Sequence, residues 1–496
     1  MSAIFELLFQ LLFYTLIANY IFYFLQRISM KKFFSLMIAL FMMTSNVITP
    51  LNKLSLQTSV SIMDQAAQEK VEFVHVYFTA LSGNFHDIII PISKLESALD
   101  NGLKYDGSSI PGCSNIFASD MHLAIDLQSF FVNPKIKNQP KTARIFADVY
   151  QDEVTPYPAD PRYMLKQAIE QAAAQDYKFF VGPEIEFFLV EKNSNGELVP
   201  WDHGNYCGVE MQQKHESIKF EMMQVLLDNG INLEKLHHEV SPGQHEIVIQ
   251  YNDPLTIADH IMLAKHLIKQ VAGNYGIIAT FMPKPFFGVN GSGMHLHFSL
   301  AEKSTGWNVF FDENDSAFLS PLAHNFLAGV LNRIQDATVI VNSCVNSFKR
   351  LVIGYEAPVY VCWAKKNRSA LIRIPQINAS QPYAARAEIR CADALCNPYL
   401  ACTFLLKAGL EGIKNNEQVK PAVEENLFKL TLTQIQDRGI TALPSSLQQA
   451  ITMFEQSSNM HAMFDPIFMA EYAKLKQSQA TQFARIVTDW ELENYV

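Results

Sequence analysis

The sequence predicts a protein in which helices and strands build two domains, a small one followed by a larger one. Two apolar runs, VEFVHVYFTA (71–80) and HDIIIPIS (86–93), have the composition of strands and are joined by the turn-like LSGNF. A proline-rich hinge, TPYPADPR (155–162), follows them. Beyond Phe179, strand patterns alternate with helix patterns to the end of the chain. We therefore expect a small mixed domain before the hinge and a larger mixed domain after it.

The first 56 residues differ in composition from everything that follows. Residues 4–25 are almost uninterrupted apolar and long enough to span a bilayer. Residues 33–43 form a second apolar run, which resembles the core of an export signal. We expect residues 1–56 to be a hydrophobic extension, either from an over-extended reading frame or serving as a single membrane anchor. The two domains would then span residues 57–152 and 153–496.

Helix signals are clearest at four places. A polar stretch at 64–70 and LESALDNG (95–102), which ends at its glycine, are expected to be helical in the first domain. A helix over 161–175 opens the second domain, because Pro161 stands at the favoured first position and apolar residues recur at helical spacing. LTIADHIMLAKHLIKQVAG (255–273) predicts another long helix.

Four of the later strands carry an apolar back and an ionisable front. In VGPEIEFFLV, Glu184 and Glu186 share one face because strand side chains alternate. MHLHFSL (294–300), HEIVIQY (245–251) and RAEIR (386–390) repeat the pattern. A solvated face would explain one such strand. Four strands whose ionisable faces consist mostly of Glu, His and Arg instead favour one concave sheet whose polar face lines a site.

Six side chains, five of them on these strands, are candidate metal ligands, since like charges on one interior face need a cation between them. They are Glu184, Glu186, Glu239, Glu246, His295 and Glu388. This oxygen-rich set suits Mg²⁺ or Mn²⁺, and its surplus charge indicates two or three ions. Together with nearby arginines it indicates a phosphoryl-transfer site. The chain has no P-loop motif, so ATP would bind in a different cradle.

Charge and cysteine content argue against other classes of function. The formal net charge of −10 and the lack of a basic stripe argue against nucleic acid as a partner. The seven cysteines form no CxxC pair and no Cys/His metal spacing. This favours free structural thiols in a reducing compartment.

From about Val71 to the C-terminus, the chain resembles glutamine synthetase of the type I, bacterial class. The motifs that carry the resemblance are YDGSSIPG, GPEIEFFLV, HHEVSPGQHEI, ATFMPKPFFGVNGSGMHLHFSL, KRLVIGYEAPVYVCWAKKNRSALIRIP, RAEIRCADALCNPYLA and DWELENY. The resemblance implies an α+β fold, with an N-terminal β-grasp-like domain and a C-terminal catalytic domain whose curved antiparallel sheet is flanked by helices. It also implies a homo-oligomer, a dodecamer of two stacked hexameric rings with active sites between subunits.

The resemblance assigns roles residue by residue. One metal would lie between Glu186, Glu239 and Glu246, and another between Glu184, His295 and Glu388. L-Glutamate would be held by Asn290, Gly291, Arg350 and Arg390, with Tyr206 near the ammonium site. ATP and its phosphates would contact Glu234, Tyr251, His297, Ser299, Arg373 and Arg386, with Tyr251 stacked on adenine. The catalytic groups would be Arg368, Asp106, which helps to deprotonate ammonium in a neighbouring subunit's site, and Glu356, on a flap that excludes water.

The implied reaction has two steps. The γ-carboxylate of glutamate attacks ATP to give γ-glutamyl phosphate and ADP, and ammonia then displaces phosphate to give glutamine. Two alternatives stay open, a ligase that joins glutamate to a polyamine and a non-catalytic structural relative. The presence of Asp106, Glu356 and every candidate metal ligand argues against both. Because ATP and glutamate are abundant in the cytoplasm, we expect the enzyme there, with membrane contact only if the N-terminal extension is made.

Three features depart from the family pattern. Asn115 stands where some members have an arginine linked to feedback control, so glutamine inhibition of that type is not expected. The segment 201–217 is unlike most members. Phe428 stands where members regulated by adenylylation carry a tyrosine, and without a hydroxyl we expect no adenylylation.

Overall fold

The computed structural model describes residues 60–113, 119–209, 212–378 and 380–496. The predicted hydrophobic extension and Asn115 lie outside these residues. The chain divides into two compact units, Met1–Gln68 and Glu69–Val496. Of the first unit, residues 60–68 are described and are helical, close to the helix expected at 64–70. Within the described part of the chain, no helix is long and apolar enough to cross a membrane.

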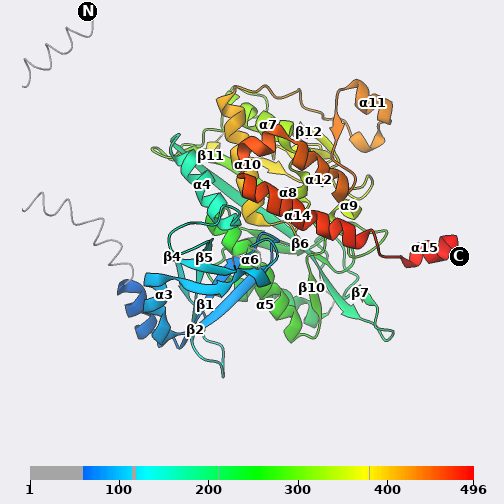
Figure 1. The fold of residues 1–496 in the computed structure, drawn as a ribbon. Coiled ribbons are helices and arrows are strands. Elements are labelled where there is room, and N and C mark those ends of the chain that lie inside the picture. Colours follow the sequence, from blue (N-terminus) through cyan, green and yellow to red (C-terminus); the bar gives the residue numbers. More distant parts are fainter. Residues whose placement is uncertain (1–59, 114–118, 210–211, 379) are drawn as a thin grey trace, which may run out of the picture. The chain divides into compact units, whose positions relative to one another are not determined.

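Five strands form the sheet of the first domain, in the order β2-β1-β5-β4-β3 (Figure 1). They are β1 (Phe73–Thr79), β2 (Phe85–Pro91), β3 (Leu103–Asp106), β4 (Asp120–Val132) and β5 (Thr142–Tyr150), with η1 (Ile92–Lys94), α3 (Leu95–Asn101) and η2 (Gly107–Ser109) between them. The predicted hairpin is confirmed by antiparallel pairing of β1 with β2, and β1 pairs in parallel with β5. Helix α3 ends at Gly102, whose φ of +68° lies where a Cβ is costly.

Ten strands form the sheet of the second domain. The main path is β15-β12-β13-β14-β11-β6-β9-β8, and β7 and β10 also pair with β6. The strands are β6 (Tyr177–Lys192), β7 (Leu198–Pro200), β8 (Leu233–His238), β9 (Gln244–Ile249), β10 (Ile278–Thr280), β11 (Met294–Glu302), β12 (Tyr360–Ala364), β13 (Ala370–Arg373), β14 (Ala387–Ile389) and β15 (Thr441–Ala442). The expected α+β fold with a mainly antiparallel catalytic sheet is confirmed.

One pair in this sheet, β12 with β13, is parallel. Parallel neighbours usually need a long crossover. Here each strand is short, about 13 Å for β12 at about 3.3 Å per residue. The five residues 365–369 are therefore long enough to run back and begin β13 in the same direction.

Five of the long helices begin with the same local signal. In α4 (Pro161–Ala173), α6 (Pro254–Asn274), α7 (Pro321–Arg333), α10 (Pro398–Lys414) and α14 (Pro466–Phe483), proline occupies the first turn and the preceding Asp, Ser or Asn accepts a backbone N–H. Such capping satisfies donors that the helix leaves unpaired. The other helices are α5 (Gln213–Asp228), α8 (Thr338–Val341), α9 (Ser347–Arg350), η3 (Pro382–Ala384), η4 (Leu427–Lys429), α11 (Leu432–Asp437), α12 (Leu447–Gln456), α13 (Ser458–Met463) and α15 (Asp489–Tyr495).

The apolar back of the larger sheet is the core of the second domain. Ile185, Ile247, Leu296 and Ile389 come from four adjacent strands and are all fully buried. Helices α4 and α6 pack against β6. The ionisable residues of the same strands are left on the opposite face, as the alternation predicts.

A buried arginine joins the two domains. Arg162, in the first turn of α4, donates to Asp259 of α6 and to Asp148 of β5, and it also pairs with Asp126 of β4. The Arg162 side chain is only 2 % exposed. Four interactions with three carboxylates compensate the cost of burying this charge.

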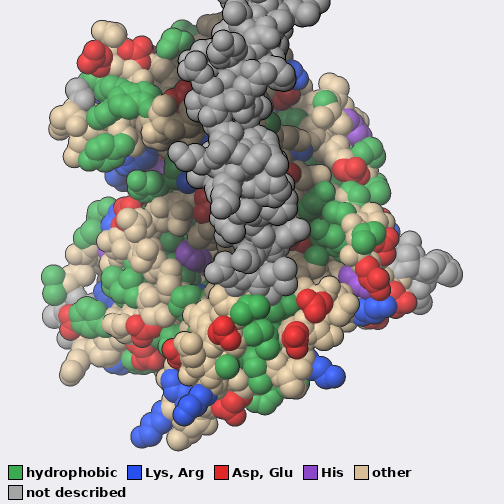
Figure 2. Space-filling model, turned by 90° about the vertical axis from the view of Figure 1, so that its left-hand side faces the viewer, with side chains coloured by type: hydrophobic (Ala, Val, Ile, Leu, Met, Phe, Trp, Pro, Cys, Tyr) green, Lys and Arg blue, Asp and Glu red, His purple; other side chains and the backbone are tan. Residues whose placement is uncertain are grey.

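The surface carries both signs of charge. On the coloured part of the face in Figure 2, Lys and Arg side chains alternate with Asp and Glu, without a continuous basic stripe.

Candidate active site

Cross-strand register brings the predicted metal ligands together on one face of the larger sheet. β6 lies between β11 and β9. Glu184 of β6 stands opposite His295 of β11, and Glu186 stands opposite Glu246 of β9. Residues far apart in sequence thus become neighbours because three strands present the same pleat side.

The first group of candidate ligands consists of Glu184, His295 and Glu388. One possible ligand atom from each lies within 4.8 Å of the others. His295 Nδ1 is 3.2 Å from Glu184 Oε2 and 3.7 Å from Glu388 Oε1. Glu388 is fully buried and pairs with Arg390 and with Arg373, whose Nε donates over 2.6 Å. These three ligand candidates are the set that the resemblance assigns to one metal.

The remaining candidates form two overlapping groups that share Glu246. One group is Glu186, Glu246 and His295, and the other is His237, Glu239 and Glu246. In each group, one possible ligand atom from each residue lies within 4.8 Å of the others. His237 Nε2 is 3.2 Å from Glu239 Oε1 and 3.7 Å from Glu246 Oε1. Sequence reasoning did not single out His237 as a ligand. The signal was available, because His237 lies two residues before Glu239 and so shares its face.

The carboxylates of this cluster are crowded and partly buried. Burial, followed by the charges of three neighbouring glutamates, raises the pKa of Glu246 to about 9. Burial opposes ionisation of Glu184 as well, yet hydrogen bonds from His295 and His297 hold its pKa well below the usual range. With protein groups alone, the carboxylates therefore cannot all be ionised near pH 7. Their oxygen donors and surplus charge fit two or three divalent ions such as Mg²⁺ or Mn²⁺.

The glycine-rich loop predicted to hold substrate packs against Arg350. A Cβ on Gly293 would lie 2.6 Å from Arg350 Nη2, and a Cβ on Gly291 would lie 3.0 Å from Arg350 Cγ. No larger residue fits this approach without displacing the arginine. Arg350 Nη2 donates to the carbonyl oxygen of Arg390 over 3.1 Å, and Glu186 accepts from Gly293 N over 2.7 Å. The loop and both arginines therefore lie beside the candidate ligands.

Two further hydrogen bonds fix this loop. Asn290 N donates to Ser241 Oγ over 3.0 Å, and Gln244 Nε2 donates to Gly291 O over 3.0 Å. Gln244 also lies 3.3 Å from Glu186 Oε2. Sequence reasoning missed Gln244, although it lies two residues before a candidate ligand on the same strand and thus on the same face.

A cavity of about 390 Å³ lies next to the cluster. Five of the predicted nucleotide residues line it: Glu234, Tyr251, His297, Ser299 and Arg386. Arg386 Nε donates to His297 Nδ1 over 3.3 Å. The sixth predicted nucleotide residue, Arg373, is not among the described residues that line the cavity, because its side chain turns to Glu388. Tyr383 lines the cavity and is 68 % exposed, and no periodic signal in the sequence marked it.

The three predicted catalytic groups, Asp106, Glu356 and Arg368, are exposed. In the described part of the chain, no hydrogen bond or ion pair links Asp106, Glu356 or Arg368 to a candidate metal ligand. The Asp106 carboxylate accepts from Ser108 N and from the hydroxyls of Ser108 and Ser109, over 2.6–3.0 Å. Glu356 has a φ of +57°, which is strained for a residue with a side chain. The structure therefore places them on the surface and does not test their roles.

Two loops border the site. The ring of Tyr206, about half exposed, meets His237 edge-on at 5.4 Å between centroids. Tyr355, the neighbour of Glu356, lies with its ring centroid 3.7 Å from Lys284 Nζ. This cation–π contact ties the predicted flap to the segment that leads into the glycine-rich loop.

Known proteins resemble the chain over nearly all of the described residues. Residues 70–152 match the family described as glutamine synthetase, beta-Grasp domain, and residues 158–495 match glutamine synthetase, catalytic domain. The chain is 42 % identical to a glutamine synthetase of Clostridium saccharobutylicum over 442 residues, covering 88 % of this chain and 98 % of the relative. It is 39 % identical to a glutamine synthetase of Methanosarcina mazei, with the same coverage.

Two solved structures share the fold over the same part of the chain. A GmaS/ADP complex superposes with a TM-score of 0.79 at 28 % identity, over 88 % of this chain and 99 % of that one. A ligand-free GmaS gives a TM-score of 0.77. The relatives are ligases, and their family uses ATP and divalent metals. With two family domains matched in order and curated relatives covered almost end to end, the chain belongs to the glutamine synthetase family of ligases.

Proposed function

We propose that this enzyme joins ammonia to the γ-carboxylate of L-glutamate, with ATP converted to ADP and phosphate by way of γ-glutamyl phosphate. The observation that carries the proposal is the position of the six candidate ligands between the loop at Arg350 and the 390 Å³ cavity. A phosphoryl group can pass between two substrates only where both meet in line. Family membership supports the same reaction.

Each side of the site would contribute a different part of the chemistry. Arg350 and Arg390 would bind the carboxylate groups of glutamate, because a guanidinium matches two carboxylate oxygens. Tyr251 would stack on adenine, and Arg386 would pair with phosphate oxygens in the cavity. Divalent ions held by the six ligands would screen the charge between the γ-carboxylate and the terminal phosphate.

The second step needs ammonia and a dry site. Asp106 of a neighbouring subunit would accept a proton from ammonium, and the flap at Glu356 would exclude water from the intermediate. Arg368 would stabilise charge on the transferring group. These three assignments come from the family resemblance, and the exposure of all three residues is compatible with it.

We further propose that the active protein is a homo-oligomer of two stacked hexameric rings. Helix α15 stands away from the other elements in Figure 1 and exposes Trp490, Leu492 and Tyr495, each more than half exposed. Such an apolar surface is costly in water and suits burial by another chain. Among the described residues, the hydrogen bonds of the Asp106 carboxylate go to Ser108 and Ser109 of its own turn, and the side chain is exposed, so it would be accessible to a partner's site.

Conditions in the cytoplasm fit the proposed reaction. ATP and glutamate are available there, and all seven cysteines are free thiols, five of them buried. We propose Mg²⁺ as the working ion, with Mn²⁺ as the alternative, and domain limits at 57–152 and 153–496. Phe428 lies in η4 and offers no hydroxyl for adenylylation.

The test is phosphate release by the full-length protein with ATP, Mg²⁺ and glutamate. Three conditions are compared, with ¹⁵N-ammonium, with putrescine and with no amine, and ¹⁵N-glutamine is followed by mass spectrometry. We expect release and ¹⁵N-glutamine with ammonium, and no release from Glu246→Ala. Asp315→Asn, at a carboxylate bound to His324 in a surface loop, should retain wild-type activity.

Each other outcome selects an alternative. Release with putrescine alone would make the protein a γ-glutamyl-amine ligase and refute glutamine synthesis. Silence in all three conditions, from a protein with a wild-type melting transition, would favour the non-catalytic relative.

A further inference from the structure

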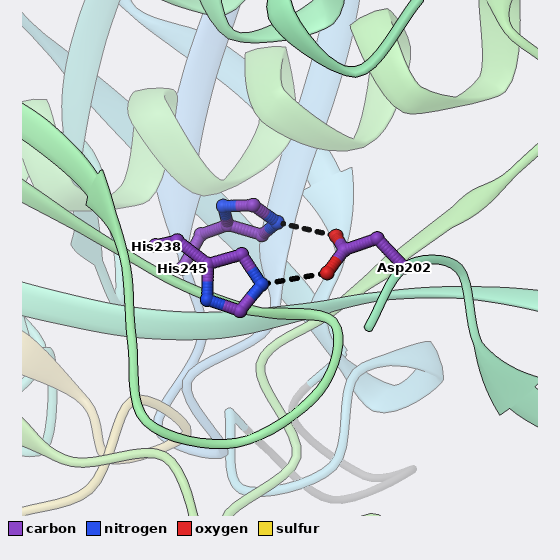
Figure 3. Close-up of side chains that lie close together, drawn as sticks. All are labelled: Asp202, His238 and His245. Atoms are coloured by element: carbon purple, nitrogen blue, oxygen red, sulfur yellow. Dashed lines mark hydrogen bonds and ion pairs between the residues drawn. The ribbon is translucent and has the colours of Figure 1, made fainter. Parts of the chain in front are cut away.

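A second cluster of ionisable residues lies behind the candidate metal ligands. Asp202, in the loop after β7, faces His238 at the end of β8 and His245 in β9 (Figure 3). All three side chains are at most 2 % exposed. His238 and His245 are directly opposite each other in the β8–β9 ladder, and their rings meet at 4.7 Å. One carboxylate therefore holds the ends of two neighbouring strands.

The contacts of Asp202 are those of a hydrogen-bond acceptor and not of a metal ligand. Its Oδ1 accepts from His238 Nε2 (2.6 Å), from Gly204 N (3.0 Å) and from Gly243 N (3.2 Å). Its Oδ2 accepts from His245 Nε2 over 3.1 Å. Three donors therefore occupy Oδ1, and one donor occupies Oδ2. Although burial opposes ionisation, the hydrogen bonds from both histidines hold the pKa of Asp202 well below its usual range.

Both histidines stand next to candidate metal ligands. Glu239 follows His238 and Glu246 follows His245, and alternation sends the glutamates to the front of the sheet when the histidines point back. The His–His pair behind the sheet thus sets the spacing of two carboxylates in front of it. When a hydrogen bond fixes the orientation of a strand at one residue, the direction of the next side chain along the strand is fixed as well.

The same contacts anchor the loop that carries Tyr206. A Cβ on Gly204 would lie 2.5 Å from the His238 ring, so only glycine allows the loop to come this close. Cys207 N donates to the carbonyl oxygen of His238 over 3.0 Å. Between these two attachments the ring of Tyr206 is presented to the front of the sheet, where it meets His237.

We propose that Asp202 is a positioning residue that acts through His238 and His245 to aim Glu239 and Glu246 at one metal ion and to hold the Tyr206 loop against the site. The inference rests on the proposed metal site. Residues that orient metal ligands from behind typically change metal affinity by about 10- to 100-fold when they are lost.

The test measures Mn²⁺ binding to the full-length protein by electron paramagnetic resonance, alongside activity at rising Mn²⁺. The variants are Asp202→Asn, which keeps the size of the side chain, and Gly204→Ala, which leaves Asp202 intact and displaces the His238 ring. The matched controls are Asp315→Asn, another carboxylate bound to a histidine and to backbone N–H groups, and Gly273→Ala, where a Cβ meets nothing within 4 Å.

We expect both cluster variants to raise the dissociation constant for Mn²⁺ about 10-fold or more at one class of site, and activity to recover as Mn²⁺ is raised. Both controls should bind like the wild type. Partial unfolding would instead lower the number of Mn²⁺ sites per chain without changing their affinity, so a merely structural role gives a different isotherm.

Two results would overturn the inference. Unchanged Mn²⁺ affinity in both cluster variants would show that the glutamates are aimed without Asp202. A stoichiometric metal in the wild-type protein that resists EDTA and is lost in Asp202→Asn would make the cluster itself a metal site. A wild type that binds no Mn²⁺ would refute the proposed metal site instead, and it is recognised before any variant is compared.

Discussion

Replacing Arg162 with methionine should destabilise the protein through charges that it leaves behind. Arg162 neutralises Asp126, Asp148 and Asp259 at the junction of the two domains, with N···O distances of 2.7–3.0 Å. Methionine fills much of the same volume but removes every one of these bonds. Lys166, the nearest remaining cation, reaches Asp126 and Asp148 but has no ion pair with Asp259. Removing one partner from a buried ion network typically costs about 3–5 kcal/mol.

Urea denaturation followed by fluorescence measures this loss. With a slope of about 3 kcal/mol per molar for a chain of this size, the midpoint should fall by about 1–1.7 M. Arg438→Met is the matched control, because Arg438 pairs with Glu425 on the surface, where such pairs are worth about 0–1 kcal/mol. The defect of Arg162→Met should shrink as the pH falls toward 5, since unpaired buried carboxyls take up protons and lose their charge.

Equal midpoint shifts for Arg162→Met and Arg438→Met would refute the reasoning, because the junction would then relax without cost. A defect that does not change between pH 8 and pH 5 would show that lost packing, and not unpaired charge, is responsible. The midpoint shift of Arg162→Lys should lie between those of Arg162→Met and Arg438→Met. An ammonium group keeps the charge but cannot bridge three carboxylates as a planar guanidinium does.

Three further predictions concern the site and its support. Tyr251→Ala should raise KM for ATP about 10-fold, because about 1–1.5 kcal/mol of stacking is lost, and should leave KM for glutamate unchanged. Steady-state kinetics with each substrate varied in turn measure both constants. An equal rise in both KM values would contradict the assignment. Arg350→Lys should raise KM for glutamate by 10-fold or more, because a point charge replaces a two-pronged donor, and unchanged glutamate kinetics would remove Arg350 from the substrate site. Burial, followed by the charge of Arg144, lowers the pKa of His260 to about 4. Between pH 6.5 and 4 only the unfolded chain protonates this histidine, so stability should fall by about 3 kcal/mol as the pH falls through that window. His260→Gln should flatten this part of the stability curve measured by thermal melting, and an unchanged slope would contradict the buried, neutral state.

Strand alternation carried most of what could be predicted about the site. Glu184 and Glu186 on one face, with Ile185 behind them, could be read directly from VGPEIEFFLV, and the structure has this arrangement. The prediction worked because a strand with one buried face leaves only one register for its side chains. His237 was not singled out, although its position two residues before Glu239 places both side chains on the same face.

Long-range contacts from loops and helix ends could not be predicted. Asp202 lies in a segment without periodicity, and its partners come 36 and 43 residues later. Arg162, in the first turn of a helix, has the sequence signature of a surface residue, and its burial depends on two strands of the other domain. A single sequence contains no signal for such pairings, because they are set by how whole elements pack.

The side chains of β9 point alternately to the back and to the front of the sheet, and this limits which insertions and deletions the segment can accept. His245 and Glu246 are adjacent, one bound behind the sheet and the other among the carboxylates in front. Deleting the one residue between Gly243 and His245 would shift the register of β9 by one residue. The Glu246 carboxylate would then point into the apolar core, and the front of the sheet would lose the glutamate that two groups of candidate ligands share. Insertions and deletions in this hairpin should therefore be tolerated only in pairs of residues.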